Sequence, residues 1–185
     1  MAEDWIEHEL IKPKTLEYRK YQTYLTDDSL GASTRIILPT GLGKTVVALI
    51  VVAKRLELFP LSKILFLAPT RPLVEQHSAF AKNFLKLEEK SISILTGEVE
   101  REARVKLWNT STLVVATPQV IVNDLKQNKI NLENVSLLIF DEAHRGIGNY
   151  AYVELASIYQ TTSRHPRAGN DSFSWLHLSA HSGRL

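Results

Sequence analysis

The most informative segment of the sequence reads Leu38-Pro39-Thr40-Gly41-Leu42-Gly43-Lys44-Thr45. It follows a short aliphatic run and precedes an apolar run of helix length. A strand, a glycine loop and a helix start in this order can cradle a phosphate, because the glycines let backbone N–H groups turn inward and the helix dipole favours an anion. Lys44 is then expected to reach the β- and γ-phosphates of a nucleotide, and Thr45 to hold Mg²⁺. Leu38 stands where the strict pattern has glycine.

A second motif reads Leu137-Leu138-Ile139-Phe140-Asp141-Glu142-Ala143-His144 and ends a buried strand with two acids. The acids are expected at the carboxyl edge of the sheet, where the glycine loop also opens. Asp141 is expected to bind Mg²⁺ directly or through water, and Glu142 to orient and deprotonate the attacking water. Lys44 and Glu142 are thus the predicted catalytic residues. The alternative is that the acids merely begin a helix and complement its dipole.

His144 closes this motif and is interpreted as a coupling residue. A zinc-ligand role is disfavoured because no second His or Cys stands at ligand spacing.

The aliphatic runs of the chain are continuous rather than alternating, which is typical of strands covered on both faces. Helix-length segments lie between them, so strands and helices alternate. The runs are 35–38, 64–68, 92–95, 113–116 and 137–140, and the helical segments are 44–59, 71–86, 98–109, 118–128 and 149–160. This order predicts an α/β fold with a doubly wound, mainly parallel sheet that binds ligands at the carboxyl ends of its strands.

Composition narrows the class of protein. The chain has 185 residues, 44% hydrophobic and 23% charged, which is ordinary globular usage and indicates one compact domain. The net charge of +2 cannot by itself attract nucleic acid, so any such site must be local. The absence of cysteine excludes disulfides and thiol catalysis. Without a signal peptide or a membrane-length apolar run, we expect a soluble, cytoplasmic protein.

Together the two motifs resemble the ATP-hydrolysing core of superfamily 2 helicases of the DEAH type. Further segments are similar to the archaeal Hef and eukaryotic FANCM/Mph1 fork-remodelling enzymes. These segments are Ala68–Val74, Thr96-Gly97, Ala116–Val120, Asn123–Leu125, Asp141–Arg145 and Gly148–Tyr152, within a coverage of about Pro13 to Tyr159. The resemblance implies the first RecA-like domain of an ATP-binding, DNA-dependent ATPase that uses ATP and Mg²⁺ and acts on forked or branched DNA in repair.

The resemblance also assigns contacts residue by residue. Gln22 resembles the residue that reads adenine, and a carboxamide can donate and accept as adenine N6 and N7 require; the alternative is a solvated side chain. Three segments resemble motifs that hold the phosphates of one DNA strand: Pro69-Thr70-Arg71, Thr96-Gly97 and Thr117-Pro118-Gln119. Each lies where a strand gives way to a helix, where N–H groups and hydroxyls can contact phosphate without reading bases. Taken singly, such helix starts are common.

Two rival functions remain open. The chain could bind ATP as a regulatory module without turnover, although Glu142 is then without a purpose. It could also belong to an RNA-duplex translocase similar to the RIG-I or Dicer group; the segment Asn149-Tyr150-Ala151-Tyr152 favours the fork-remodelling group by resemblance.

The C-terminal residues differ from the rest in composition, because Arg164 to Leu185 contain no Lys, Glu, Ile or Val. We expect a RecA-like domain over 1–168 and an atypical tail over 169–185 that is mobile or packs only opportunistically. The resemblance implies a strand that ends in Thr-Ala-Ser or Ser-Ala-Thr, followed by Pro-Gly, at about this point. A one-nucleotide insertion near Gly169 is the hypothesis for its absence from the tail; the alternative is that Leu176–His181 is a displaced version of this motif. With no room for a second RecA-like domain and its arginine fingers, the chain is expected to be a fragment with little activity alone.

Overall fold

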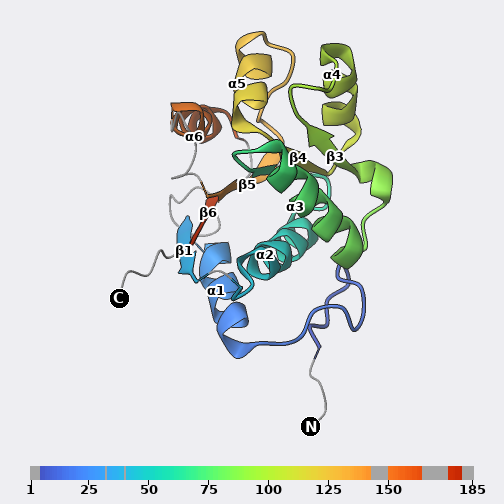
Figure 1. Ribbon diagram of the computed structural model, residues 1–185, viewed down its shortest axis with the longest axis vertical. Coiled ribbons are helices and arrows are strands. Elements are labelled where there is room, and N and C mark those ends of the chain that lie inside the picture. The colour runs from blue at the N-terminus through green and yellow to red at the C-terminus, as the bar shows by residue number, and fades with distance from the viewer. Residues whose placement is uncertain (1–4, 32, 40, 143–149, 164–174, 181–185) are drawn as a thin grey trace.

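A six-stranded parallel sheet forms the centre of the molecule (Figure 1). The computed structural model describes residues 5–31, 33–39, 41–142, 150–163 and 175–180. The strands are β1 (Thr34–Leu38), β2 (Lys63–Leu67), β3 (Ile92–Leu95), β4 (Leu113–Ala116), β5 (Val135–Asp141) and β6 (Trp175–Ala180). Their order across the sheet is β1-β6-β5-β2-β4-β3, and every pairing is parallel. The predicted α/β architecture is confirmed.

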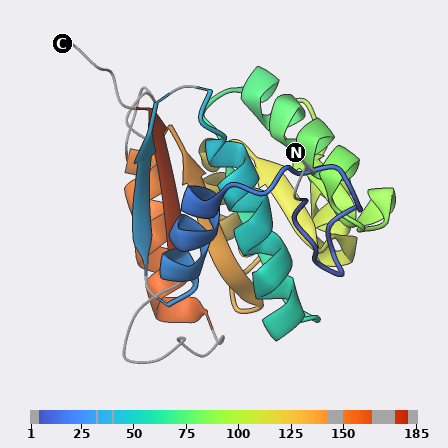
Figure 2. The same ribbon diagram turned by 90° about the horizontal axis from the view of Figure 1, so that it is seen from below.

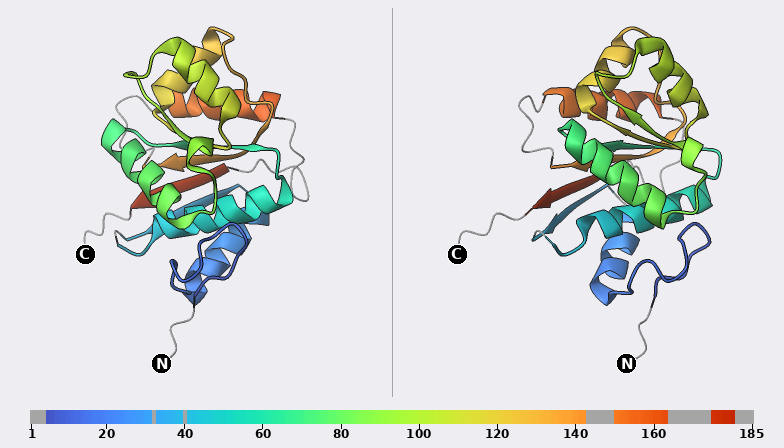
Figure 3. Two further views of the ribbon diagram at one scale, coloured as in Figure 1. Left: turned by 90° about the vertical axis from the view of Figure 1, so that its right-hand side faces the viewer. Right: turned by 45° about the vertical axis from the view of Figure 1, so that its right-hand side comes forward.

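Helices cover both faces of this sheet, as Figure 3 shows. The helices are α1 (Lys20–Gly31), α2 (Lys44–Leu58), α3 (Arg71–Phe84), α4 (Arg101–Thr110), α5 (Pro118–Lys126) and α6 (Tyr150–Thr162), with a short 3₁₀ turn at Glu89–Ser91. Helices α1, α2 and α3 lie on one face, where the apolar side of α2 packs on strand residues such as Phe66 and Ile139. Helices α4, α5 and α6 lie on the other, where Trp108 and Leu155 pack on Leu65. None of the helices described is long and apolar enough to cross a membrane.

The predicted continuous burial of the strands is right for the middle of the sheet and wrong for β1. All residues of β2, β4 and β5 are buried. Strand β1 lies at the edge of the sheet, and only Ile36 is fully buried in it, while Ile37 is 49% exposed. An aliphatic run therefore indicated a strand here, but its place at the edge leaves one face open.

The expected boundary at residue 168 is wrong, because part of the tail belongs to the sheet. Strand β6 lies between β1 and β5 (Figure 2), with Ile36 aligned to Leu178 and Ile139 aligned to Leu176. Leu176 is 1% exposed and Leu178 is fully buried. Opportunistic packing is therefore excluded for Trp175–Ala180, and the position of β6 favours the displaced-motif alternative. Residues 164–174 and 181–185 lie outside the described residues.

Candidate active site

The glycine loop owes its shape to two residues in the left-handed region. Gly41 has φ +89° and Gly43 has φ +77°, a conformation that L side chains rarely adopt. A Cβ at Gly43 would lie 2.5 Å from Gln22 Nε2, so the end of the Gln22 side chain would have to shift to admit it. The chain then enters α2 at Lys44, so Lys44 and Thr45 occupy the first helical positions, as expected. Thr40 lies outside the described residues.

Two side chains of helix α1 contact the backbone of this loop. Tyr21 Oη donates a hydrogen bond to Leu42 O at 2.9 Å, and Gln22 Nε2 lies 3.5 Å from the same carbonyl. Gln22 is 2% exposed, so the alternative of a solvated side chain is wrong. Its Oε1 is buried and has no hydrogen-bond partner among the described residues. An accepting oxygen thus remains at the loop, and the adenine contact stays a prediction.

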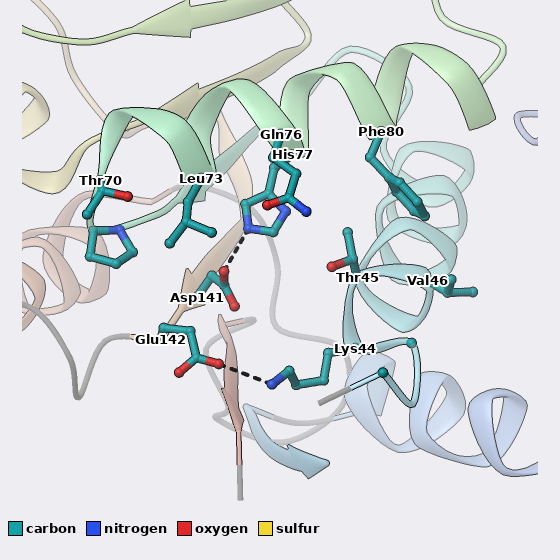
Figure 4. A pocket seen from close by; sticks show the side chains of 13 residues that line it. Lys44, Thr45, Val46, Thr70, Leu73, Gln76, His77, Phe80, Asp141 and Glu142 are labelled. Atoms are coloured by element: carbon teal, nitrogen blue, oxygen red, sulfur yellow. Dashed lines mark hydrogen bonds and ion pairs between the residues drawn. The ribbon is translucent and has the colours of Figure 1, made fainter. Parts of the chain in front are cut away.

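The two acids lie opposite the loop, at the carboxyl end of β5 (Figure 4). Glu142 Oε1 forms an ion pair with Lys44 Nζ at 3.1 Å, and the two side chains are 13% and 14% exposed. Glu142 has φ +47°, which is rare outside glycine, and its backbone N–H donates to Leu178 O of β6 at 2.9 Å. Asp141 ends β5 and Glu142 is left-handed, so neither residue lies in the first turn of a described helix. Residues 143–149 lie outside the described residues, so the helix-start alternative is not tested.

A cavity of about 650 Å³ lies between the loop and α3, and part of the predicted nucleotide set lines it. Of the described residues in that set, Gln22, Leu38, Pro39 and Leu42 are not in the lining. Lys44 is the only Lys or Arg among the described residues that line it. The lining residues are Gly41, Gly43, Lys44, Thr45, Val46, Pro69, Thr70, Leu73, Gln76, His77, Phe80, Asp141 and Glu142. The expected convergence of loop and acids at one strand edge is therefore present.

The donor set fits Mg²⁺ held together with nucleotide phosphates. The described residues contain no group of three or more His, Cys, Asp or Glu that could hold a metal alone. Mg²⁺ commonly takes one or two carboxylates and completes its shell with phosphate oxygens and water. Asp141 and the Thr45 hydroxyl, which both face the cavity, supply ligands of this kind.

Gln76, His77 and Phe80 of α3 also line the cavity, and the sequence analysis singled out none of them. His77, in the second turn of α3, lies with Nε2 2.7 Å from Asp141 Oδ2. It is 5% exposed, and its ring packs on Phe66 with the centroids 4.6 Å apart. Its spacing of seven residues from Thr70, about two helical turns, is the only signal in the sequence that puts it on the same side of α3.

The three segments with predicted DNA contacts lie at the carboxyl ends of three neighbouring strands. They follow β2, β3 and β4, which are neighbours in the order β2-β4-β3. Thr70 and Thr117 precede the first residues of α3 and α5. The exposed members of the set are Thr70, Arg71, Gly97 and Gln119, whereas Pro69 and Thr117 are partly buried.

Two details of this edge differ from the expectation. Thr96 is 5% exposed and Pro118 is also buried, so a hydroxyl contact from Thr96 to phosphate is not supported in this conformation. Arg71 is already engaged by Glu75 at 2.6 Å and by Glu98, and these carboxylates raise the pKa of its guanidinium. His144, the predicted coupling residue, lies outside the described residues. So does Asn149, which belongs to the segment that resembles the fork-remodelling group.

Comparison with known proteins agrees with this geometry. The family model described as DEAD/DEAH box helicase matches residues 19–180. A protein of Methanocaldococcus jannaschii named as an ATP-dependent RNA helicase is 44% identical over 156 residues, which are 84% of this chain and 20% of that protein. The Drosophila melanogaster DEAD-box ATP-dependent DNA helicase Fancm is 35% identical over 181 residues, 96% of this chain and 12% of that protein.

A solved structure extends the likeness to the fold. The crystal structure of the Pyrococcus furiosus Hef helicase domain matches with a TM-score of 0.78 and 40% sequence identity, over 91% of this chain and 34% of that chain. The chain spans 20% or less of the two curated relatives named above. Since the family model covers both the glycine loop and the acidic strand end, and reaches through β6, the chain belongs to the DEAD/DEAH box helicase family and is similar within it to Hef and Fancm.

Proposed function

We propose that this chain binds ATP with Mg²⁺ in the cavity between the glycine loop and α3, as the ATP-binding domain of a DNA-dependent ATPase that acts on forked or branched DNA inside the cell. The observation that carries the proposal is the ion pair between Lys44 and Glu142, which both line the cavity, with Nζ and Oε1 3.1 Å apart. A lysine for phosphate and an acid for water thus face one another at the edge where α2 begins. This edge of the sheet also carries the candidate DNA contacts.

The ion pair suggests what the residues do during binding. Lys44 exchanges Glu142 for the phosphates of ATP, because a polyanion offers the ammonium more charge than one carboxylate. Glu142 is thereby released, and its carboxylate can orient a water and take its proton. The backbone N–H groups at the start of α2 donate to the phosphates. Bound Mg²⁺ would be held by Thr45 and Asp141 and would supply charge neutralisation on the phosphate oxygens.

The DNA part of the proposal rests on the edge formed by the ends of β2, β4 and β3. The exposed residues Thr70, directly before α3, and Gln119, at the second position of α5, offer N–H groups and polar side chains to a phosphate backbone. Such contacts carry no base preference, and their affinity falls with salt. Weak binding without sequence preference is therefore expected of this chain.

DNA and RNA are separated by a direct comparison, which the name of the M. jannaschii relative makes necessary. Fluorescence anisotropy of labelled duplex DNA, forked DNA and duplex RNA of one sequence, at several salt concentrations, gives the three affinities. We expect forked DNA to bind best and affinity to drop steeply with salt. Preference for the RNA duplex would reassign the substrate, and tight, sequence-selective binding that survives high salt would contradict a backbone contact.

A further inference from the structure

His77 holds one oxygen of the Asp141 carboxylate by a buried contact, as the dashed line in Figure 4 marks. The distance between His77 Nε2 and Asp141 Oδ2 is 2.7 Å, and the side chains are 6% and 7% exposed. An ionised carboxylate only accepts hydrogen bonds, so Nε2 is the donor in this contact. The bond is therefore charge-assisted and in a region that excludes most water.

The other ring nitrogen has no such partner. His77 Nδ1 is buried and makes no hydrogen bond to any described residue. Buried polar atoms in native proteins are normally paired, and an unpaired one costs free energy. A histidine retained only for packing against Phe66 would be replaced by an apolar side chain at no such cost. The single bond to Asp141 is thus the feature that sets His77 apart.

The hydrogen bond between His77 and Asp141 also connects α3 to the acidic end of β5. Helix α3 begins at Arg71, directly after Thr70, and reaches His77 two turns later on the side that lines the cavity. Through His77 the helix that begins at a candidate DNA contact is joined to the carboxylate predicted to bind the metal. In Figure 4 the second oxygen of Asp141 is turned away from His77.

We infer that His77 is a positioning residue that fixes the Asp141 carboxylate by the Nε2–Oδ2 hydrogen bond, so that its other oxygen is presented to the Mg²⁺ of the bound nucleotide. The inference rests on the proposed function and names a residue for it. Carboxylate ligands of metals are commonly oriented by a hydrogen bond of this kind, and its loss typically lowers metal affinity by about 10- to 100-fold.

The test compares two amides of different length. In His77→Gln the side-chain amide reaches as far as Nε2, whereas in His77→Asn it ends near the place of Nδ1 and cannot reach Asp141. Calorimetry with a non-hydrolysable ATP analogue, in excess Mg²⁺ and in EDTA, gives the factor by which Mg²⁺ increases affinity. We expect His77→Gln to keep most of this factor and His77→Asn to lose about tenfold or more of it, with affinity in EDTA unchanged in both.

Each result decides a separate question. An unchanged Mg²⁺ factor in His77→Asn overturns the inference, and so does an equal loss in the Asn and Gln variants, which would show a packing role. If the Asn variant is destabilised, its EDTA affinity falls too, and His77→Gln then decides alone: a Mg²⁺ factor reduced about tenfold overturns the inference. If the wild-type chain binds no nucleotide in either condition, the proposed function itself fails.

Discussion

Lys44 and Glu142 pair with each other, so each charge is already neutralised in the candidate site. Their side chains are about one-seventh exposed, with the Nζ–Oε1 distance at 3.1 Å, so the contact is partly shielded from water. The lysine has no other charged partner among the described residues. Any phosphate that enters must compete with this carboxylate, so the pair lowers the affinity for weakly charged ligands more than for a triphosphate.

The first prediction is that Lys44→Ala removes nucleotide binding, because no other Lys or Arg among the described residues lines the cavity. Calorimetric titration with ATP and Mg²⁺ measures this. Lys54→Ala is the matched control, since Lys54 loses the same charge but pairs with Asp27 on the surface. Equal ATP affinity in wild type and Lys44→Ala would show that the phosphate site is elsewhere.

A second residue, Lys63, makes stability depend on pH. Its Nζ donates to Trp108 O at 2.5 Å and to Ser111 O at the end of α4, and burial lowers its pKa to about 8. The unfolded chain, with an ordinary lysine pKa near 10.5, holds this proton longer. Between the two values the unfolded state binds more protons, so the free energy of unfolding rises with pH through this window and is level below it.

Lys63→Met should therefore remove this rise. Urea unfolding at about pH 7 and about pH 10 gives the free-energy difference for wild type, for Lys63→Met and for Lys54→Met, a control in which the replaced lysine is partly exposed. We expect the wild type and Lys54→Met to gain stability relative to Lys63→Met at the higher pH. Parallel pH dependence in all three proteins would contradict a lowered pKa at Lys63.

At the scale of elements, most strands and helices could be predicted from the sequence. The two exceptions, helix α1 and strand β6, have physical causes. The strands β2 to β5 are continuous aliphatic runs because both of their faces are covered. Helix α1 was missed because its sequence, KYQTYLTDDSLG, has no clear apolar stripe. Strand β6 was expected only under the displaced-motif alternative, because WLHLSA mixes Leu176 and Leu178 with His177 and Ser179.

The candidate site also has parts that the sequence predicts and parts that it does not. The loop and the acids could be predicted because each motif stands at a strand end. The Glu142 conformation, the His77 contact and the buried Gln22 depend on distances between segments far apart in the chain, which local pattern does not contain.

The edge formed by α3 and the loop after β3 leads to a third prediction. Arg71 is held by Glu98 from that loop, so the cation nearest the start of α3 is partly neutralised before DNA arrives. Glu98→Gln should increase DNA affinity about two- to fivefold at low salt, as expected for one exposed ion pair. Anisotropy with forked DNA measures the change.

Glu88→Gln is the control for this prediction, because it makes the same charge change at the opposite end of β3, where Glu88 pairs with Lys90. An equal gain in both variants would indicate a general charge effect and would remove Arg71 from the contact.

For the whole molecule, the place of β6 makes Trp175–Ala180 part of the fold. Leu178 is fully buried between β1 and β5, so Leu178→Ala should destabilise the protein by about 2–5 kcal/mol. Leu61→Ala, at a site that is 91% exposed, should change stability by less than about 0.5 kcal/mol. Denaturant unfolding measures both. A similar small effect in the two variants would show that the tail is weakly attached after all.

The insertion hypothesis stays a prediction about the gene. It requires that the codons of Asn170 to Trp175 read Met-Thr-Ala-Ser-Pro-Gly in the neighbouring frame, and sequencing the coding DNA decides it. The burial of Leu176 and Leu178 weighs against it, because an unselected frame would have to supply a central strand by chance.

A fifth prediction concerns turnover by the 185-residue chain alone. The cavity's described lining contains Lys44 and Glu142 but no arginine, and an arginine at the transferred phosphate is worth about 10³–10⁵ in rate. Phosphate release in the presence of saturating forked DNA should therefore stay well below about 1 s⁻¹. A rate near that value would show that the residues present complete the site.

Because β6 comes last among the described strands yet lies between β1 and β5, the sheet cannot be completed in the order of synthesis. Strands β2, β3, β4 and β5 can pair as they leave the ribosome, while β1 waits for a neighbour made much later. Pairing over such a separation is slow, and until it happens one edge of β5 is open to aggregation or to chaperones. Strand β1, which leads into the glycine loop, can therefore join the sheet only after β6 has been synthesised.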